Sequence, residues 1–248
     1  MVHDLDPRPS VIRDRLSGVA RVVCVSAGKG GVGKSSVAST LALLGAEQGM
    51  AVGLLDLDLT GPTDHVILGA RLGFPSEEYG IDPERHAGIS FLSVAHFLGM
   101  DAAALRGGDV TNTLLELLAI ARWGALDALV IDMPPGLGDT ALDVHRYLPK
   151  AAHLVVSTPS RLACESVRRC LSLLSKQGAP VLGVVENMKA KADDSTEVAE
   201  LAAAFGLRHL GSLPRDPDLE SALGTPERVR ATAFASALRP IATEIFGS

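Results

Sequence analysis

The feature that most restricts the fold is the segment GKGGVGKS at residues 28–35, which lies between an apolar run and a helix-length run. Gly28, Gly33, Lys34 and Ser35 match the G-x-x-x-x-G-K-[ST] pattern of phosphate-binding loops, or P-loops. This pattern needs a strand before it and a helix after it, and the flanking segments RVVCVS and SSVASTLALLGAEQG have those properties. The sequence therefore predicts a β-loop-α unit that holds nucleotide phosphates.

The rest of the chain alternates short apolar runs with helix-length segments. The apolar runs predict strands at residues 21–26, 51–57, 89–94, 128–132, 153–157, 181–186 and 210–213. Helices are predicted at 34–48, 111–122, 162–176 and 196–205. Because runs such as LDALVID are apolar throughout, we expect both faces of the sheet to be covered. The predicted fold is α/β, a doubly wound, mostly parallel sheet flanked by helices.

Length and composition set further bounds. The chain has 248 residues without a repeat or low-complexity tract, so a single domain is expected. Residues 1–20 are predicted to form an N-terminal extension and 21–248 a single P-loop domain, which the family resemblance given below makes an ATPase domain. A net charge of -6 gives no general basic field for nucleic acid. Three scattered cysteines, no apolar leader and no apolar run of membrane-spanning length favour a cytoplasmic protein.

The loop residues have distinct predicted roles. Glycines let backbone N–H groups surround phosphate oxygens, and the N-terminus of the following helix favours negative charge. Lys34 is predicted to reach the β- and γ-phosphates as a catalytic residue, and Ser35 to ligate Mg²⁺. A glycine-rich turn without a ligand is the alternative, and the Lys-Ser pair that opens the helix argues against it. The predicted nucleotide-binding residues here are Gly28, Lys29, Gly30, Gly31, Val32, Gly33, Lys34, Ser35 and Ser36.

Lys29 is a second lysine within the loop, which the pattern itself does not require. Its position is similar to the signature lysine of the group that contains MinD, ParA and the nitrogenase iron protein. In that group, dimerisation across the nucleotide places the lysine on the partner's phosphates, like an arginine finger. The resemblance implies a homodimer in which Lys29 is catalytic, whereas a solvated loop lysine is the alternative.

Two aspartates follow the second predicted strand in GLLDLDLTGP. Asp56 and Asp58 occupy alternate positions, so their side chains leave the strand end on the same side, facing the phosphates. Asp58 is predicted to orient or activate the attacking water. Asp56 is predicted either to join the Mg²⁺ shell or to fix the loop that senses the γ-phosphate. Without the P-loop nearby, both would be interpreted as caps of a strand-to-loop turn.

The segment LVIDMPPGLGDT places Asp132 at the end of an apolar run, as a Walker B aspartate is placed. Ser35, Asp56 and Asp132 are therefore the predicted Mg²⁺ residues, binding directly or through water. Gly136 is predicted to bring its backbone to the γ-phosphate in a switch-like turn, together with Gly138, and Asp139 to cap a helix. An ordinary turn at the PPG segment is the alternative.

These motifs together resemble the Mrp-type iron-sulfur cluster carrier ATPases of the MinD/ParA group. The resemblance covers nearly the whole chain, and DLTGP, WGALD, IDMPPGLGD and GVVENM are similar to the Mrp-like branch in particular. It implies a nitrogenase-iron-protein-like fold and an ATP- and Mg²⁺-dependent ATPase dimer acting in iron-sulfur protein or metalloenzyme maturation. It also implies that Asn187, in VVENM, recognises adenine through its amide, and that Pro214 lies in a loop whose backbone contacts the base.

One departure from that family concerns its cysteines. Mrp-type carriers have a C-x-x-C pair shortly after ENM, whereas this chain continues as ENMKAKADDSTEVAE. Cluster ligation needs thiolates, so the sequence argues against an iron-sulfur cluster held by this chain alone. Cys164 and Cys170 are six residues apart on one predicted helix and point in different directions, so they and Cys24 are interpreted as packing residues.

Other functions remain open from the sequence. A heterodimer with a related ATPase would supply the missing cysteines, and a chaperone-like ATPase for one unknown client protein fits the same motifs. A MinD- or ParA-like positioning ATPase would need a basic amphipathic C-terminal helix or a basic face. The C-terminal segment ATAFASALRPIATEIFGS has little charge and a proline, Pro240, that is expected to interrupt it, so no strong membrane or nucleic-acid signal is present.

Overall fold

The computed structural model describes residues 6–73, 75–97, 108–136, 147–148, 151–190 and 194–247. In these ranges eight strands form one sheet in the order β3-β4-β2-β5-β1-β6-β7-β8. All neighbouring strands are parallel except β3 and β4. The strands are β1 (Val22–Ala27), β2 (Val52–Asp56), β3 (Glu84–His86), β4 (Ile89–Ser93), β5 (Ala128–Asp132), β6 (Ala152–Ser157), β7 (Val181–Lys189) and β8 (His209–Pro214). The predicted mostly parallel α/β sheet is confirmed.

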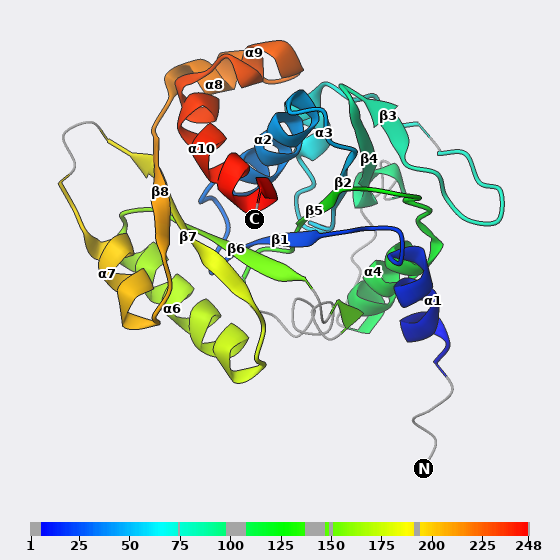
Figure 1. The fold of residues 1–248 in the computed structure, drawn as a ribbon, viewed down its shortest axis with the longest axis horizontal. Coiled ribbons are helices and arrows are strands. Elements are labelled where there is room, and N and C mark those ends of the chain that lie inside the picture. Colours follow the sequence, from blue (N-terminus) through cyan, green and yellow to red (C-terminus); the bar gives the residue numbers. More distant parts are fainter. Residues whose placement is uncertain are drawn as a thin grey trace.

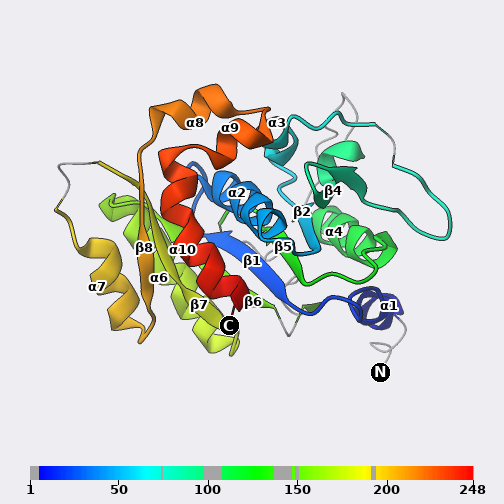
Figure 2. The same cartoon turned by 45° about the horizontal axis from the view of Figure 1, so that its top comes forward.

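Helices cover both faces of the sheet (Figures 1 and 2). Over one face, α10 packs along α2 and β8, and over the other, α1 packs on α4 and α6 on α7. The short helix α3 lies beside α2, and the 3-10 turn η1 follows β4. The helices are α1 (Arg8–Arg15), α2 (Lys34–Glu47), α3 (Asp64–Leu68), η1 (Val94–His96), α4 (Gly108–Ile120), α6 (Arg161–Lys176), α7 (Glu197–Ala204), α8 (Pro217–Ala222), α9 (Pro226–Arg230) and α10 (Ala233–Gly247).

Strand β1 illustrates why the apolar runs belong in this sheet. Successive side chains of a strand point to opposite faces. Val23 and Val25 accordingly lie in the core beneath α2 and α10, whereas Cys24 lies in the core that contains α4. All three are fully buried, and a polar side chain buried at any of these positions without a hydrogen-bonding partner would be destabilising.

The seven predicted strands are all present, and the eighth, β3, is new. Its sequence, Glu84-Arg85-His86, is polar and largely exposed, so it carries no apolar signal. It pairs antiparallel with β4 through a turn at Ala87 and Gly88, which both have positive φ, 50° and 88°. The strand therefore depends on the turn and on its neighbour rather than on its own hydrophobicity.

The described part of the predicted N-terminal extension, from residue 6 on, contains the helix α1. Ile12 of this helix is fully buried in the core that contains α4. Arg15 donates to the backbone oxygens of Ala119, at 3.0 Å, and Tyr79, at 2.9 Å. The helix therefore packs on the P-loop fold, while the division of the chain at residue 20 stays a prediction.

The expectation that Pro240 interrupts the C-terminal segment is wrong, because α10 continues through it. A proline inside a helix costs about 3 kcal/mol. Burying an apolar side chain contributes about 1.5–3 kcal/mol, and α10 buries several, so packing outweighs the lost hydrogen bond. The buried side chains include Phe234, Leu238, Ile241 and Ile245. Pro240 itself lies on the exposed side.

Candidate functional site

The P-loop connects β1 to α2 at the carboxyl end of the sheet, as predicted. Gly31 and Gly33 have positive φ values of 77° and 82°, which side chains with a Cβ rarely adopt. Gly33 is the N-cap of α2, so the first N–H groups of this helix open toward the loop. On the other side, a Cβ at Gly28 would lie 2.3 Å from the backbone carbon of Ser166, so α6 contacts the loop directly.

Asn187 holds the loop from the end of β7. Its Nδ2 donates to the backbone oxygen of Val32 at 2.8 Å, and its Oδ1 accepts from the N–H of Met188 at 2.8 Å. Met188 has a φ of 59°, a strained value for a side chain of this kind. The structure thus places Asn187 beside the phosphate part of the site, while its contact with adenine stays a prediction.

Replacing Gly33 with alanine should lower the free energy of unfolding by more than about 2 kcal/mol. The new Cβ would lie 2.2 Å from Asn187 Nδ2, and moving that buried amide breaks both of its hydrogen bonds. Gly31→Ala is the matched control, because φ is also positive but no atom lies within 4 Å of the new Cβ. It should cost about 1 kcal/mol, the strain alone. Equal losses for the two variants in chemical denaturation would contradict the role given to Asn187.

Carboxylates gather at the ends of the two strands next to the loop. Asp56 ends β2 and Asp132 ends β5, and the two residues are partners in the parallel register. Both are fully buried. Asp132 Oδ1 accepts from Lys34 Nζ at 2.7 Å, and Asp132 Oδ2 accepts from Ser35 Oγ at 2.6 Å. The first turn of α2 is therefore joined to the end of β5.

Asp58 lies on the other side of the same lysine. Its Oδ2 is 3.6 Å from Lys34 Nζ. Its Oδ1 accepts from the N–H and the hydroxyl of Thr60, at 3.1 and 2.6 Å, and from the N–H of Gly61, at 3.2 Å. The carboxylate is thus fixed in position at the carboxyl edge of the sheet, while its role toward an attacking water stays a prediction.

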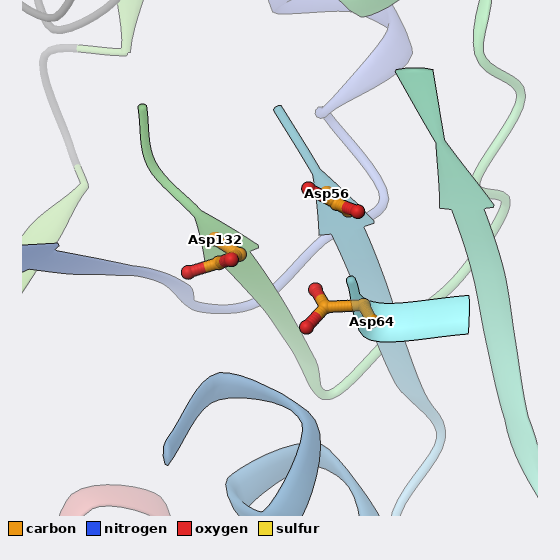
Figure 3. Close-up of side chains that lie close together, drawn as sticks. All are labelled: Asp56, Asp64 and Asp132. Atoms are coloured by element: carbon orange, nitrogen blue, oxygen red, sulfur yellow. The ribbon is translucent and has the colours of Figure 1, made fainter. Parts of the chain in front are cut away.

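A third buried carboxylate, Asp64, joins Asp56 and Asp132 (Figure 3). It opens α3, and its Oδ1 accepts from Ser39 Oγ at 2.8 Å. One oxygen from each of the three carboxylates lies within 4.8 Å of the others. Sequence reasoning missed Asp64, because an aspartate at the start of a short helix is ordinary. The sequence did contain one indication that Ser39 lies near the site. It follows Ser35 by four residues, so the two serines lie on the same face of the helix.

The crowding of these acids changes their proton affinities. Burial, with the nearby charge of Asp132, raises the pKa of Asp56 to about 7. Burial and the charges of Asp132 and Asp56 raise the pKa of Asp64 well above its ordinary value. Burial alone would lower the pKa of Lys34, but the charges of Asp132 and Asp58 outweigh it and raise that pKa. Lys34 therefore stays cationic within an excess of carboxylates.

The remaining predicted residues lie around the loop at different distances. A Cβ at Gly136 would lie 4.0 Å from the backbone oxygen of Gly28, so the PPG segment borders the loop. Lys29 is partly exposed, and no described carboxylate pairs with it. Ser36 lies in the first turn of α2. Pro214 ends β8, in register with Lys189 of β7. Predictions for Gly138 and Asp139 lie outside the described residues.

The three cysteines are free thiols and are buried. Burial raises the pKa of Cys24 and of Cys170 to about 12, so neither forms a thiolate readily. The Sγ of Cys164 lies 3.9 Å from Ser157 Oγ. Among the described residues, no group of three potential ligands includes a cysteine. The three thiols are packing residues, as predicted: Cys24 lies in the core that contains α4, and Cys164 and Cys170 lie in the core that contains α6.

A parallel sheet with this loop, lysine and aspartate arrangement defines a nucleotide-binding P-loop NTPase. Residues 18–246 match the model of the ParA-type family described as NUBPL iron-transfer P-loop NTPase. The chain belongs to that family, as its resemblance to Mrp-type carriers predicts. In the described part of the chain, no helix combines the length and apolar character needed to span a bilayer.

Individual relatives agree with the family. An iron-sulfur cluster carrier protein of Aquifex aeolicus is 35% identical over 230 residues, which are 86% of this chain but only 62% of that protein. One from Pseudomonas fragi is 37% identical over 243 residues, 92% of this chain and 83% of that protein. Among solved structures, the nucleotide-binding protein of Archaeoglobus fulgidus in complex with ADP is 28% identical, with a TM-score of 0.77 over 92% of this chain and 95% of that one.

Proposed function

We propose that this protein is an ATP-hydrolysing, Mg²⁺-dependent dimer that acts in iron-sulfur protein maturation without holding a cluster of its own. The observation that supports the ATPase part of this proposal is the contact of Lys34 and Ser35, at the N-terminus of α2, with Asp132. These groups supply a cation for the phosphates and an oxygen-rich place for Mg²⁺.

The residues fit ATP and Mg²⁺ in their chemistry. Ser35, Asp56 and Asp132 would hold Mg²⁺, which supplies charge neutralisation on the phosphates. The backbone N–H groups between Gly28 and Ser36 would hold the phosphate oxygens, with Gly136 approaching the γ-phosphate. Lys34 must leave Asp132 to reach the phosphates, so nucleotide entry exchanges one ion pair for another.

Hydrolysis needs an oriented water and a positive charge on the phosphates, and we assign these two tasks to different residues. Asp58, fixed by Thr60 and Gly61, would orient the attacking water. Lys29 has no carboxylate partner among the described residues and is partly exposed, as a lysine offered to a second subunit would be. We assign it to the phosphates of the partner's ATP in a homodimer. Asn187 and Pro214 are assigned to the adenine side.

The iron-sulfur part of the proposal comes from the relatives, whose names describe cluster carriers. This chain contains three cysteines, all buried, and among the described residues no group of three potential ligands includes one of them. Because clusters are ligated by thiolates, a lone homodimer has no site for one. The protein would then act on the cluster of a partner subunit or client, through the opening and closing of its ATP-gated dimer.

Anaerobic reconstitution with iron and sulfide tests the cluster-free part directly. After desalting, the homodimer should retain well under one iron-sulfur cluster per dimer, measured as iron, sulfide and visible absorbance. The matched control is a variant with Ala190→Cys and Asp193→Cys, which restores a C-x-x-C spacing after the ENM segment. A stoichiometric cluster on the unmodified protein would contradict the proposal. The expected result is a cluster retained by the double-cysteine variant and not by the unmodified protein.

A further inference from the structure

The three buried carboxylates come from separate elements and meet beside the first half of α2, where Ser35 and Ser39 contact two of them. Asp56 ends β2, Asp132 ends β5 and Asp64 opens α3 (Figure 3). Each is fully buried, and one oxygen of each lies within 4.8 Å of the others. Negative charges brought so close in a buried place repel one another strongly, so the arrangement needs a compensating group.

Serine hydroxyls fix one oxygen of each carboxylate. Ser35 donates to Asp132 at 2.6 Å, Ser39 to Asp64 at 2.8 Å, and Ser93 to Asp56 at 2.9 Å. These neutral donors orient the acids but carry no positive charge. The positions of the three side chains are therefore set before anything binds between them.

Asp64 is left incomplete by these contacts. Its Oδ1 has Ser39, but its Oδ2 is buried and has no hydrogen-bonding partner. In Figure 3, the Asp64 carboxylate is directed toward the space beside Asp56 and Asp132. A buried carboxylate oxygen without a hydrogen-bonding partner destabilises the folded protein, so a ligand at this atom would be stabilising.

The lysine nearby does not supply enough charge. Lys34 Nζ lies 2.7 Å from Asp132 and 3.6 Å from Asp58, so a single cation is shared by two acids. Asp56 and Asp64 have no cationic partner of their own among the described residues. One divalent cation between the three carboxylates would balance the excess.

We propose that Asp56, Asp64 and Asp132 form a binding site for one divalent cation that fills without a nucleotide. The inference rests on the proposed function only in that Asp56 and Asp132 also serve the Mg²⁺ of ATP. Asp56 and Asp132 alone would need the phosphates of ATP to complete the shell of a metal ion. With Asp64 as a third anionic ligand, the protein itself can hold the ion. A cation bound there would also replace Lys34 as the charge partner of Asp132, which would free Lys34 Nζ to bind the phosphates.

The ligands select the chemical class of the cation. All are carboxylate oxygens, which suit Mg²⁺, Mn²⁺ and Ca²⁺ rather than metals that prefer thiolate or imidazole. Such ions hold oxygens at 2.0–2.6 Å, so the ligands around one ion lie at most about 4–5 Å apart. The three oxygens lie within 4.8 Å of one another, which is within the limit for the larger of these ions.

Mn²⁺ titration of the nucleotide-free protein tests the site, with the loss of the free Mn²⁺ signal followed by electron paramagnetic resonance. After treatment with EDTA and desalting, the wild-type chain should bind one Mn²⁺. Asp64→Asn should weaken this binding at least about tenfold, because even a residue behind the ligands changes affinity by that factor. Asp82→Asn, which removes an exposed carboxylate paired with Arg122, should bind like wild type.

Thermal unfolding separates lost binding from lost folding. Asparagine keeps the size of Asp64 and an oxygen for Ser39, so the variant should unfold in EDTA at or above the wild-type temperature. Mn²⁺ should raise that temperature for the wild type and not for Asp64→Asn. Absent Mn²⁺ binding by the wild type, or equal affinity for Asp64→Asn, would overturn the site. No nucleotide is present, so a protein that fails to hydrolyse ATP would still give the expected metal result.

Discussion

Alanine at Lys34 is expected to abolish ATP binding, weakening the affinity by at least about a hundredfold, or 2.7 kcal/mol. The loss has two causes. The phosphates lose a cation that makes charge-assisted hydrogen bonds. In addition, Asp132 and Asp58 lose the lysine that lies 2.7 and 3.6 Å from them, so uncompensated carboxylates face the incoming phosphates. Isothermal titration with ATP and Mg²⁺ measures the change.

The control variant removes a lysine charge far from the P-loop in the sequence. Lys176 lies on the exposed end of α6, and Lys176→Ala should bind ATP within about twofold of wild type. Circular dichroism should find both variants folded. ATP binding by folded Lys34→Ala at near wild-type affinity would contradict the assignment of the phosphate site.

Alanine at Lys29 should give the opposite pattern, with ATP bound and hydrolysis lost. Lys29 is partly exposed and pairs with no described carboxylate, so its removal should change the ATP affinity by at most about fivefold, or 1 kcal/mol. If the lysine reaches the partner's phosphates, turnover should fall about a thousandfold, as on removal of an arginine finger. Phosphate release at saturating ATP measures it.

A second substitution at the same position tests whether charge is the reason. Lys29→Arg keeps a cation of similar reach and should recover a substantial part of the lost turnover, although its geometry differs. Unchanged turnover in Lys29→Ala would mean that the residue is a solvated loop lysine. Loss of ATP binding together with turnover would place Lys29 on its own subunit's nucleotide.

The parts of the site that sequence predicted are those fixed by local spacing. The loop from Gly28 to Ser35 needs its glycines and its lysine at fixed intervals, and Asp132 follows an apolar run that can only be a buried strand. The contact of Asp56 with Asp132 follows from strand order, since ends of parallel strands meet at one edge of the sheet. Local spacing and the order of the strands are therefore enough to predict these features.

Asp64 does not follow from local spacing, because its role depends on how α3 packs against α2. The helix is five residues long, and only its docking beside Ser39 carries the aspartate into the core. Strand β3 and the unbroken course of α10 were not predicted either, because they too depend on packing against neighbouring elements. Their own sequences, polar in one case and interrupted by Pro240 in the other, are outweighed by neighbouring contacts.

The central claim, hydrolysis across a dimer, is tested most directly by mixing two inactive variants. The Lys29→Ala subunit keeps Asp58 in its own site but supplies no lysine to the partner's ATP. The Asp58→Asn subunit supplies Lys29 to the partner's ATP but lacks the aspartate in its own site. In a mixed dimer, the nucleotide bound to the Lys29→Ala subunit would meet both groups. An equal mixture should regain about one quarter of wild-type turnover, because half of the dimers contain one complete site of two. A mixture as inactive as either variant alone, with ATP still bound by both, would contradict hydrolysis across the dimer.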